Sequence, residues 1–141
     1  MKLTAYHATD MANASMILRG GFRLDVNHKH DPGDFGQAVY LTTSLARARA
    51  IGKVILTVEL DLNSPLELSD SDAYALVIDK LGFDTIHGKN HPGGRHEAAE
   101  KAREHFLADG HDALISCRNV PCEEEMEIAV YDLKAIKRVR L

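Results

Sequence analysis

The sequence predicts a mixed α+β domain, and three features of its pattern lead to this prediction. Short stretches in which apolar and polar residues alternate, as in half-buried strands, recur along the 141 residues. Between them lie segments with the spacing of amphipathic helices, bounded by serine or aspartate at one end and glycine at the other. No repeat, low-complexity tract or linker divides the chain, so we expect a single domain over residues 1–141.

The composition is ordinary for a soluble globular protein, with 45% hydrophobic and 27% charged residues. The net charge of −4 gives no overall basic field for nucleic acid, although residues 134–140 form a local basic strip. No apolar run approaches the roughly 18 residues of a membrane span. The N-terminus alternates like a strand and lacks the apolar block of a signal peptide. We therefore expect a cytoplasmic protein without membrane contact, most simply a monomer.

The first third of the chain is predicted to hold two strands and one helix. A strand over about residues 2–7 leads into a helix that Asp10 can cap and Gly20-Gly21 can end. The polar segment 22–32 is predicted to form a long loop, and loops of this length are often functional. A second strand is expected over residues 35–42, entered through a glycine-containing turn. The apolar stripe of the helix consists of Met11, Ala14, Ile17 and Leu18.

The remaining elements alternate between helices and strands. Ser44 is expected to cap a short helix that ends at Gly52, and a later helix begins at Ser69 or Asp70. The predicted helices cover residues 45–51, 69–81 and 95–108, and the predicted strands cover 53–62, 112–117, 125–132 and 136–141. Residues 63–65 break the first of these strands, and the glycine- and proline-rich residues 88–94 are expected to form an exposed loop.

Three polar or aromatic side chains stand out on the predicted strands. In the strand near the C-terminus, Met126, Ile128 and Val130 face one way, so that Glu127 faces the other way together with Ala129 and Tyr131. His7 ends the first strand, and Tyr40 lies on the second. We predict that His7, Tyr40 and Glu127 converge on one cleft.

The segments around these residues resemble motifs of the ADP-ribosyltransferase superfamily. Tyr6-His7-Ala8-Thr9 is similar to the family's His-Gly-Thr strand end, and Phe35-Gly36-Gln37-Ala38-Val39-Tyr40-Leu41 to its Phe-Gly-x-Gly-x-Tyr-Phe strand. Glu127-Ile128-Ala129-Val130-Tyr131-Asp132 resembles the Glu-x-x-Val-Tyr-Asp strand that carries the catalytic glutamate. The three motifs occur in the family's order, as in the His-Tyr-Glu type shared by diphtheria-like toxins and poly(ADP-ribose) polymerases. The resemblance implies two packed, mainly antiparallel sheets that form an NAD cleft, with flanking helices.

The resemblance also implies an activity, that of an NAD-dependent mono-ADP-ribosyltransferase acting on a protein or nucleic-acid acceptor. Glu127 would stabilise the oxocarbenium-like state, and no metal would be required. Tyr40 would stack on the nicotinamide, and His7 would orient the dinucleotide through an imidazole donor near the adenosine-side ribose. The NAD contacts would be completed by Ala8, whose backbone holds the nicotinamide amide, and by Thr9 and Gly36. Glu125, which forms a Glu-x-Glu pair with Glu127, would position the acceptor.

Several positions depart from the family pattern. Ala8 and Ala38 replace glycines, and Leu41 replaces an aromatic residue. The helix after the Tyr40 strand offers Ile51 where polymer-forming members carry a second stacking tyrosine, which favours mono-transfer. An NAD glycohydrolase and a transferase directed at nucleic acid or a tRNA 2′-phosphate remain alternatives on the same fold. A non-catalytic binding module is the alternative of another class, and the two alanines favour it.

Each of these residues also has a purely structural interpretation. His7 can be a half-buried strand-end histidine, Tyr40 a core residue, and Glu127 part of a solvated sheet face. Residues 123–125 can likewise form a solvated acidic run that includes Glu125. A zinc site at His87, His91 and His96 has little support, and Ser44 is a helix cap and not part of a catalytic triad.

The only two cysteines lie five positions apart on either side of a predicted turn. Cys117 and Cys122 can pair at this separation. Because we expect a cytoplasmic protein, we predict that both are reduced thiols.

Overall fold

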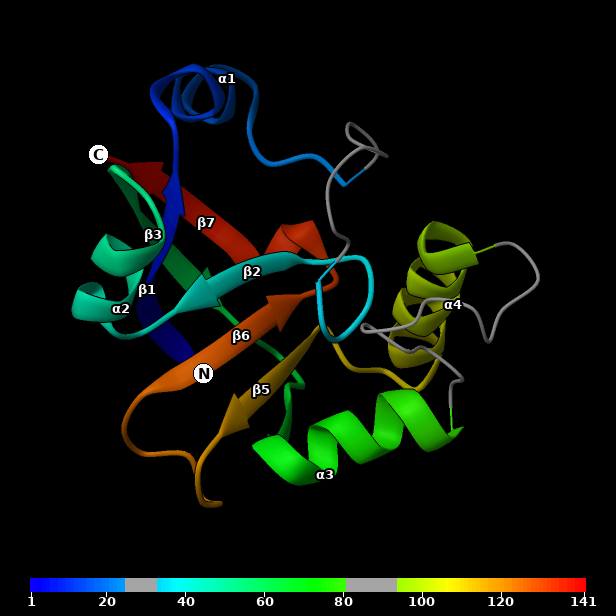
Figure 1. Ribbon diagram of the computed structural model, residues 1–141. Helices are drawn as coiled ribbons and strands as arrows, with labels where there is room; N and C mark the ends of the chain where they lie inside the picture. Colours follow the sequence, from blue (N-terminus) through cyan, green and yellow to red (C-terminus); the bar gives the residue numbers. More distant parts are fainter. Residues whose placement is uncertain (25–32, 81–93) are drawn as a thin grey trace.

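A computed structural model describes residues 1–24, 33–80 and 94–141. It confirms an α+β architecture, in which these residues form a mixed sheet of seven strands and four α-helices (Figure 1). The strands are β1 (Lys2–Thr9), β2 (Val39–Thr42), β3 (Val54–Asp61), β4 (Leu66–Ser69), β5 (Ala113–Cys117), β6 (Met126–Val130) and β7 (Ile136–Arg140). The α-helices are α1 (Met11–Gly20), α2 (Leu45–Ile51), α3 (Asp70–Ala75) and α4 (Gly94–Ala108). A π-helical turn at Leu76–Lys80 continues α3, and a 3-10 turn at Leu133–Ala135 precedes β7.

The hydrogen-bonded order of the strands is β4-β5-β6-β2-β1-β3-β7. Only β4 and β5 run parallel, and every other neighbouring pair is antiparallel. Eight residue pairs join β1 to β3, but a single pair, Tyr6 with Thr42, joins β1 to β2. The sheet is therefore continuous but narrow at this junction, where the expected arrangement had two separate sheets.

Two hydrophobic cores lie on the two faces of the sheet. The first combines residues from both parts of the sheet, namely Ala5, Val58 and Leu60 from β1 and β3, and Val39, Leu41, Ile115, Ile128 and Val130 from β2, β5 and β6. The second lies under α3 and α4 and includes Ala73, Ala99, Phe106, Leu114, Ala129 and Tyr131. The alternation predicted for β6 is confirmed, because Ile128 and Val130 enter the first core while Ala129 and Tyr131 enter the second.

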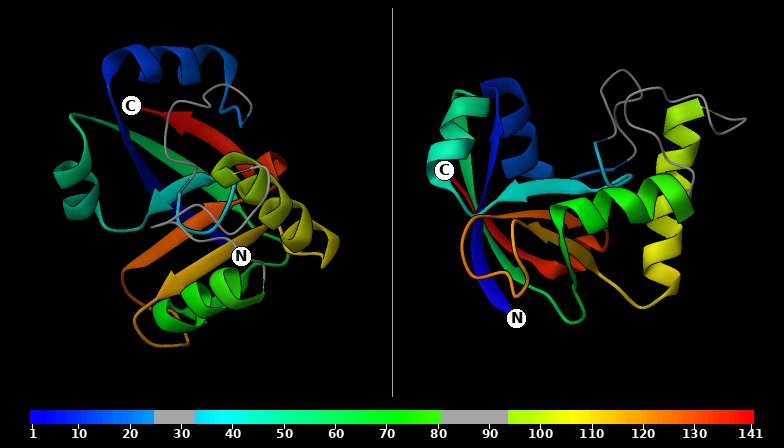
Figure 2. Two further views of the ribbon diagram at one scale, coloured as in Figure 1. Left: turned by 45° about the vertical axis from the view of Figure 1, so that its right-hand side comes forward. Right: turned by 60° about the horizontal axis from the view of Figure 1, so that its bottom comes forward.

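The helices gather at opposite ends of the molecule, α1 and α2 at one end and α3 and α4 at the other (Figure 2). The predicted caps are confirmed. The Asp10 carboxylate accepts from the Asn13 amide at 2.8 Å, and the Ser44 hydroxyl accepts from the Arg47 amide at 3.2 Å. The predicted apolar stripe of α1 is wrong in part, because Ala14 is buried whereas Met11 and Leu18 are exposed.

Two strand predictions need correction. The second strand begins at Val39 and not at Phe35, because Gly36 adopts a positive φ angle of 98°, outside the extended conformation of a strand. Strand β4 was not predicted: residues 66–68 were left between the expected break at 63–65 and the next helix, which was expected to begin at Ser69 or Asp70. It is only four residues long and forms through parallel pairing with β5, more than 40 residues away in the sequence.

The prediction of two reduced cysteines is also wrong, because Cys117 and Cys122 form a disulfide. Their Cα atoms lie 5.7 Å apart, since the connection that follows β5 folds back before β6 begins. The expectation relied on the cellular compartment, whereas the geometry of this connection decides the pairing. Within the described part of the chain, no helix has both the length and the apolar character needed to cross a membrane. Of the loops predicted at 22–32 and 88–94, residues 25–32 and 88–93 lie outside the described residues.

Candidate active site

His7 and Tyr40 are in contact at the junction of β1 and β2. Nδ1 of His7 lies 3.0 Å from the Tyr40 carbonyl oxygen. A carbonyl oxygen can only accept, so Nδ1 carries the hydrogen. Burial lowers the pKa of His7, and the hydrogen bond to Tyr40 opposes this only in part, so the ring is neutral at pH 7. Nε2 is then a lone-pair acceptor, and the N–H that was predicted to contact the ligand is used within the protein.

Tyr40 is held by its hydroxyl group as well as by its strand. The hydroxyl donates to the Gly36 carbonyl oxygen at 2.6 Å and accepts from the Phe35 amide at 2.9 Å. The Phe35 carbonyl oxygen in turn accepts from the buried Tyr131 hydroxyl at 2.6 Å. A Cβ at Gly33 would overlap the Tyr40 ring, so this turn closes tightly around the side chain. Tyr40 is thus fixed by neutral hydrogen bonds to one turn.

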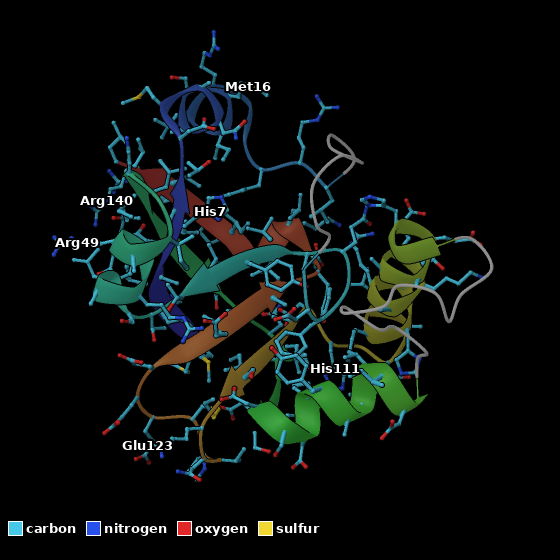
Figure 3. All side chains as sticks on the ribbon, viewed as in Figure 1. His7, Met16, Arg49, His111, Glu123 and Arg140 are labelled. Carbon is cyan, nitrogen blue, oxygen red and sulfur yellow. A yellow bond between two sulfur atoms is a disulfide. The ribbon has the colours of Figure 1, made fainter. Side chains whose placement is uncertain are left out.

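His7 and Tyr40 both line a cavity of about 760 Å³ between β1, β2 and α1. Figure 3 shows His7 below α1 and beside β2. The volume lies within the range of small-molecule sites. Edge-to-face contact with Phe22, at 5.1 Å between ring centroids, supports the His7 ring from one side. Thr9 and Ala38 also line this cavity.

Two arginines that were not predicted also line the large cavity. Arg19 lies in the last turn of α1, and Arg23 follows two residues after Gly21. Both side chains are exposed, and Arg19 also donates from Nε to the Ser15 carbonyl oxygen at 3.3 Å. Guanidinium groups suit the paired oxygens of phosphates. The sequence signal that could have found them is a pair of arginines on either side of a helix-ending Gly-Gly.

Glu127 lies in a second, smaller cavity of about 330 Å³. The pleat puts it on the same face of the sheet as Tyr40, since Tyr40 pairs with Ala129 and Thr42 pairs with Glu127. Such diagonal neighbours lie roughly 7–8 Å apart. The His7 side chain lies on the opposite face, the face of Ala5, and its ring hydrogen-bonds to the backbone carbonyl of Tyr40. The three residues therefore form a row from His7 through Tyr40 to Glu127, and His7 and Glu127 line different cavities.

The surroundings of Glu127 contain both signs of charge. Nε of Arg47 lies 2.7 Å from Oε1 of Glu127. Burial raises the pKa of Glu127, the Arg47 guanidinium lowers it, and the carboxylates of Asp34 and Asp70 raise it again. Asp70 also accepts a hydrogen bond from the Ser116 hydroxyl, and Ser116 is the β5 neighbour of Glu127. The Arg47 guanidinium thus favours the ionised form of the Glu127 carboxyl group, whereas the two aspartates favour its protonated form.

The other predicted site residues have different surroundings. Ala8 lines a third, mostly apolar cavity beside Ile51 and Gly52, and Gly36 packs against α4, where its carbonyl oxygen anchors Tyr40. Glu125 precedes β6 and is exposed, yet it lines the same cavity as Glu127.

Two further predictions concern histidines and a serine. Ser44 is confirmed as a helix cap. Of the three histidines considered for zinc, His87 and His91 lie outside the described residues. No group of three His, Cys, Asp or Glu side chains suited to a metal occurs among the residues that are described.

No family model matches this chain, and no curated protein is significantly similar to it in sequence. A function must therefore be argued from the site itself.

Proposed function

We propose that this protein is an NAD-dependent mono-ADP-ribosyltransferase, which cleaves the nicotinamide–ribose bond and transfers ADP-ribose to an acceptor. The observation that carries the proposal is the position of Glu127 diagonal to Tyr40 on one sheet face, together with the hydrogen bond from the His7 ring to the Tyr40 carbonyl oxygen. The same three residues stand at the matching positions of three motifs that resemble those of the His-Tyr-Glu transferases. Sequence motifs and spatial order therefore support the same assignment.

The chemistry of NAD cleavage requires a negative charge close to the ribose. As the bond to nicotinamide breaks, nicotinamide leaves with the bonding electrons and positive charge develops on the ribose ring, as in glycoside hydrolysis. An ionised Glu127 would accept a hydrogen bond from the ribose 2′-hydroxyl and stabilise this charge. The acceptor nucleophile then bonds to the ribose carbon and loses its proton. These steps need no metal.

The large cavity supplies groups that suit the rest of the dinucleotide. The Tyr40 ring offers an aromatic face for the nicotinamide, and the Nε2 lone pair of neutral His7 can accept from a ribose hydroxyl. Arg19 and Arg23, which line the same cavity, suit the pyrophosphate. An NAD molecule whose nicotinamide lies at Tyr40 would bring its adjoining ribose toward Glu127.

The proposal is tested by the release of nicotinamide from NAD by purified protein, in buffer and with added cell lysate. Wild type is compared with Glu127→Gln and with Glu124→Gln, a matched change of an exposed acid outside the cavity. We expect release that depends on lysate, is lost in Glu127→Gln and persists in Glu124→Gln. Binding of NAD is followed in parallel by the shift in melting temperature.

The other outcomes are equally informative. Equal release in buffer and in lysate would identify an NAD glycohydrolase, with water as the acceptor. Normal turnover by Glu127→Gln would contradict the catalytic assignment. Absence of both release and any NAD-dependent shift in melting temperature would contradict the proposed function as a whole.

A further inference from the structure

Arg47 is brought to Glu127 by the turn that joins β2 to α2. It is the third residue of α2, and its backbone amide donates to the Ser44 side chain that caps the helix. Its Nε atom lies 2.7 Å from Oε1 of Glu127, within the distance of a charge-assisted hydrogen bond. A carboxylate on the interior strand β6 is therefore contacted by a guanidinium from a different element.

Among the residues that the structure describes, the other groups facing Glu127 do not supply a second positive contact of this kind. Asp34 precedes β2, while Asp70 and Tyr74 belong to α3, and all three interact electrostatically with Glu127. Thr42 and Ser116 pair with it from the neighbouring strands, and the Ser116 hydroxyl donates to Asp70. Arg118 and Glu125, from the connection between β5 and β6, complete the charged lining of the cavity.

We propose that Arg47 is a positioning residue for Glu127, whose guanidinium holds the carboxylate in one orientation and keeps it negatively charged. This inference rests on the proposed function, because a carboxylate must be ionised to stabilise an oxocarbenium-like state. Burial and the two aspartates favour the protonated form of Glu127, and Arg47 is the group that opposes them. Without Arg47, the pKa of Glu127 would therefore rise further.

A merely structural role for this ion pair would give different results. The Arg47 and Glu127 side chains are 59% and 37% exposed, and pairs this open to solvent contribute little to folding stability. Replacement of Arg47 is therefore expected to leave the melting temperature nearly unchanged while it alters the titration of Glu127. Arg49, exposed on the same helix and outside the cavity, provides a matched control.

The test is a pH titration of the Glu127 side-chain carboxyl by ¹³C NMR, with its resonance identified by its absence in Glu127→Gln. Four proteins are compared: wild type, Arg47→Gln, Arg47→Lys and Arg49→Gln. We expect the Glu127 midpoint to move to higher pH in Arg47→Gln, to return toward the wild-type value in Arg47→Lys and to stay unchanged in Arg49→Gln. An unchanged midpoint in Arg47→Gln would overturn the inference.

Nicotinamide release by the same four proteins, measured across pH, separates this inference from the proposed function. In Arg47→Gln we expect the acid limb of kcat to shift to higher pH, with roughly a tenfold loss of kcat on the acid side, by analogy with other residues that orient a reactive group. If wild type is active and Arg47→Gln keeps its pH profile, the role of Arg47 is refuted alone. If wild type releases no nicotinamide, the proposed function fails, while the carboxyl titration still decides whether Arg47 controls the charge of Glu127.

Discussion

Tyr40 and Glu127 lie side by side on one sheet face, but different forces hold them. Tyr40 is fixed by uncharged hydrogen bonds to the turn at Phe35 and Gly36, which itself packs against α4. Glu127 is fixed by an ion pair in contact with solvent and is surrounded by further charges. Neutral, partly buried hydrogen bonds are costly to break, whereas an exposed ion pair adds little stability but controls protonation.

Under the proposed function, folding stability would depend mainly on the Tyr40 turn and turnover mainly on Glu127. Changes at the Tyr40 turn should lower the free energy of unfolding and the affinity for NAD. Changes at Glu127 should spare the fold and act on turnover. The four predictions below test this division, beginning with the largest expected effect.

The largest effect is expected at Glu127. Glu127→Gln should lower kcat on the order of 10²-fold or more, because it removes a charge that stabilises the transition state, and should leave the Kd for NAD nearly unchanged. Tyr40→Ala should instead raise the Kd as well as lower the rate, through loss of the stacking surface. Steady-state kinetics and calorimetric titration measure the two quantities. Loss of NAD affinity in Glu127→Gln with kcat retained would reverse the proposed division.

The substitution Gly36→Ala should destabilise the Tyr40 turn. Gly36 has φ of 98°, and an added Cβ would lie 2.8 Å from the Ala102 Cβ. Left-handed backbone and overpacking together predict a loss of roughly 2–4 kcal/mol in the free energy of unfolding. Gly20→Ala is the control, because nothing lies within 4 Å of its added Cβ and its φ is not positive. Denaturant unfolding gives the free energy of unfolding of both variants. Equal values for the two would show that the turn accommodates the added methyl group without loss of stability.

Removal of one hydroxyl should separate anchoring from stacking. Tyr40→Phe keeps the ring but leaves the Phe35 amide and the Gly36 carbonyl without this partner, at a cost of about 1–3 kcal/mol. Tyr131→Phe removes the hydroxyl that donates to Phe35 on the opposite side of the turn, and should destabilise the protein by a similar amount. Only Tyr40 lines the large cavity, so only Tyr40→Phe should also weaken NAD binding. Equal NAD affinity in both variants would show that the Tyr40 hydroxyl, and the anchoring it provides, does not contribute to NAD binding.

The smallest effect is expected from the titration of His7. Its pKa is lowered from the ordinary 6.5 by burial, so between 6.5 and the lower folded value the unfolded chain binds more protons than the native one. Stability should therefore fall as the pH decreases through this interval and level off below the folded pKa. Denaturant unfolding across pH should show this component in wild type and lack it in His7→Asn. The same dependence in both proteins would assign it to other groups.

Local elements were predictable from the sequence because their causes lie close together in the chain. Asp10 and Ser44 cap their helices through amides three residues ahead, and the two faces of β6 follow from strict alternation. The start of β2 was placed too early, since the Tyr40 hydroxyl and two glycines convert the residues before Val39 into a turn. Strand β4 was missed because a four-residue parallel strand exists only through its distant partner β5.

For the candidate site, the sequence by itself determined which residue types stand on which strands: a histidine at the end of β1, a tyrosine on β2 and a glutamate on β6. It also determined that Tyr40 and Glu127 would face the same side once β2 and β6 paired in register. Three features were decided only by the tertiary structure. The His7 N–H donates to the Tyr40 carbonyl oxygen, Glu127 lines a different cavity from His7, and the Arg47 guanidinium lies beside the Glu127 carboxylate. These features depend on contacts across the sheet, and sequence spacing does not specify which charged side chains from different elements will lie next to one another.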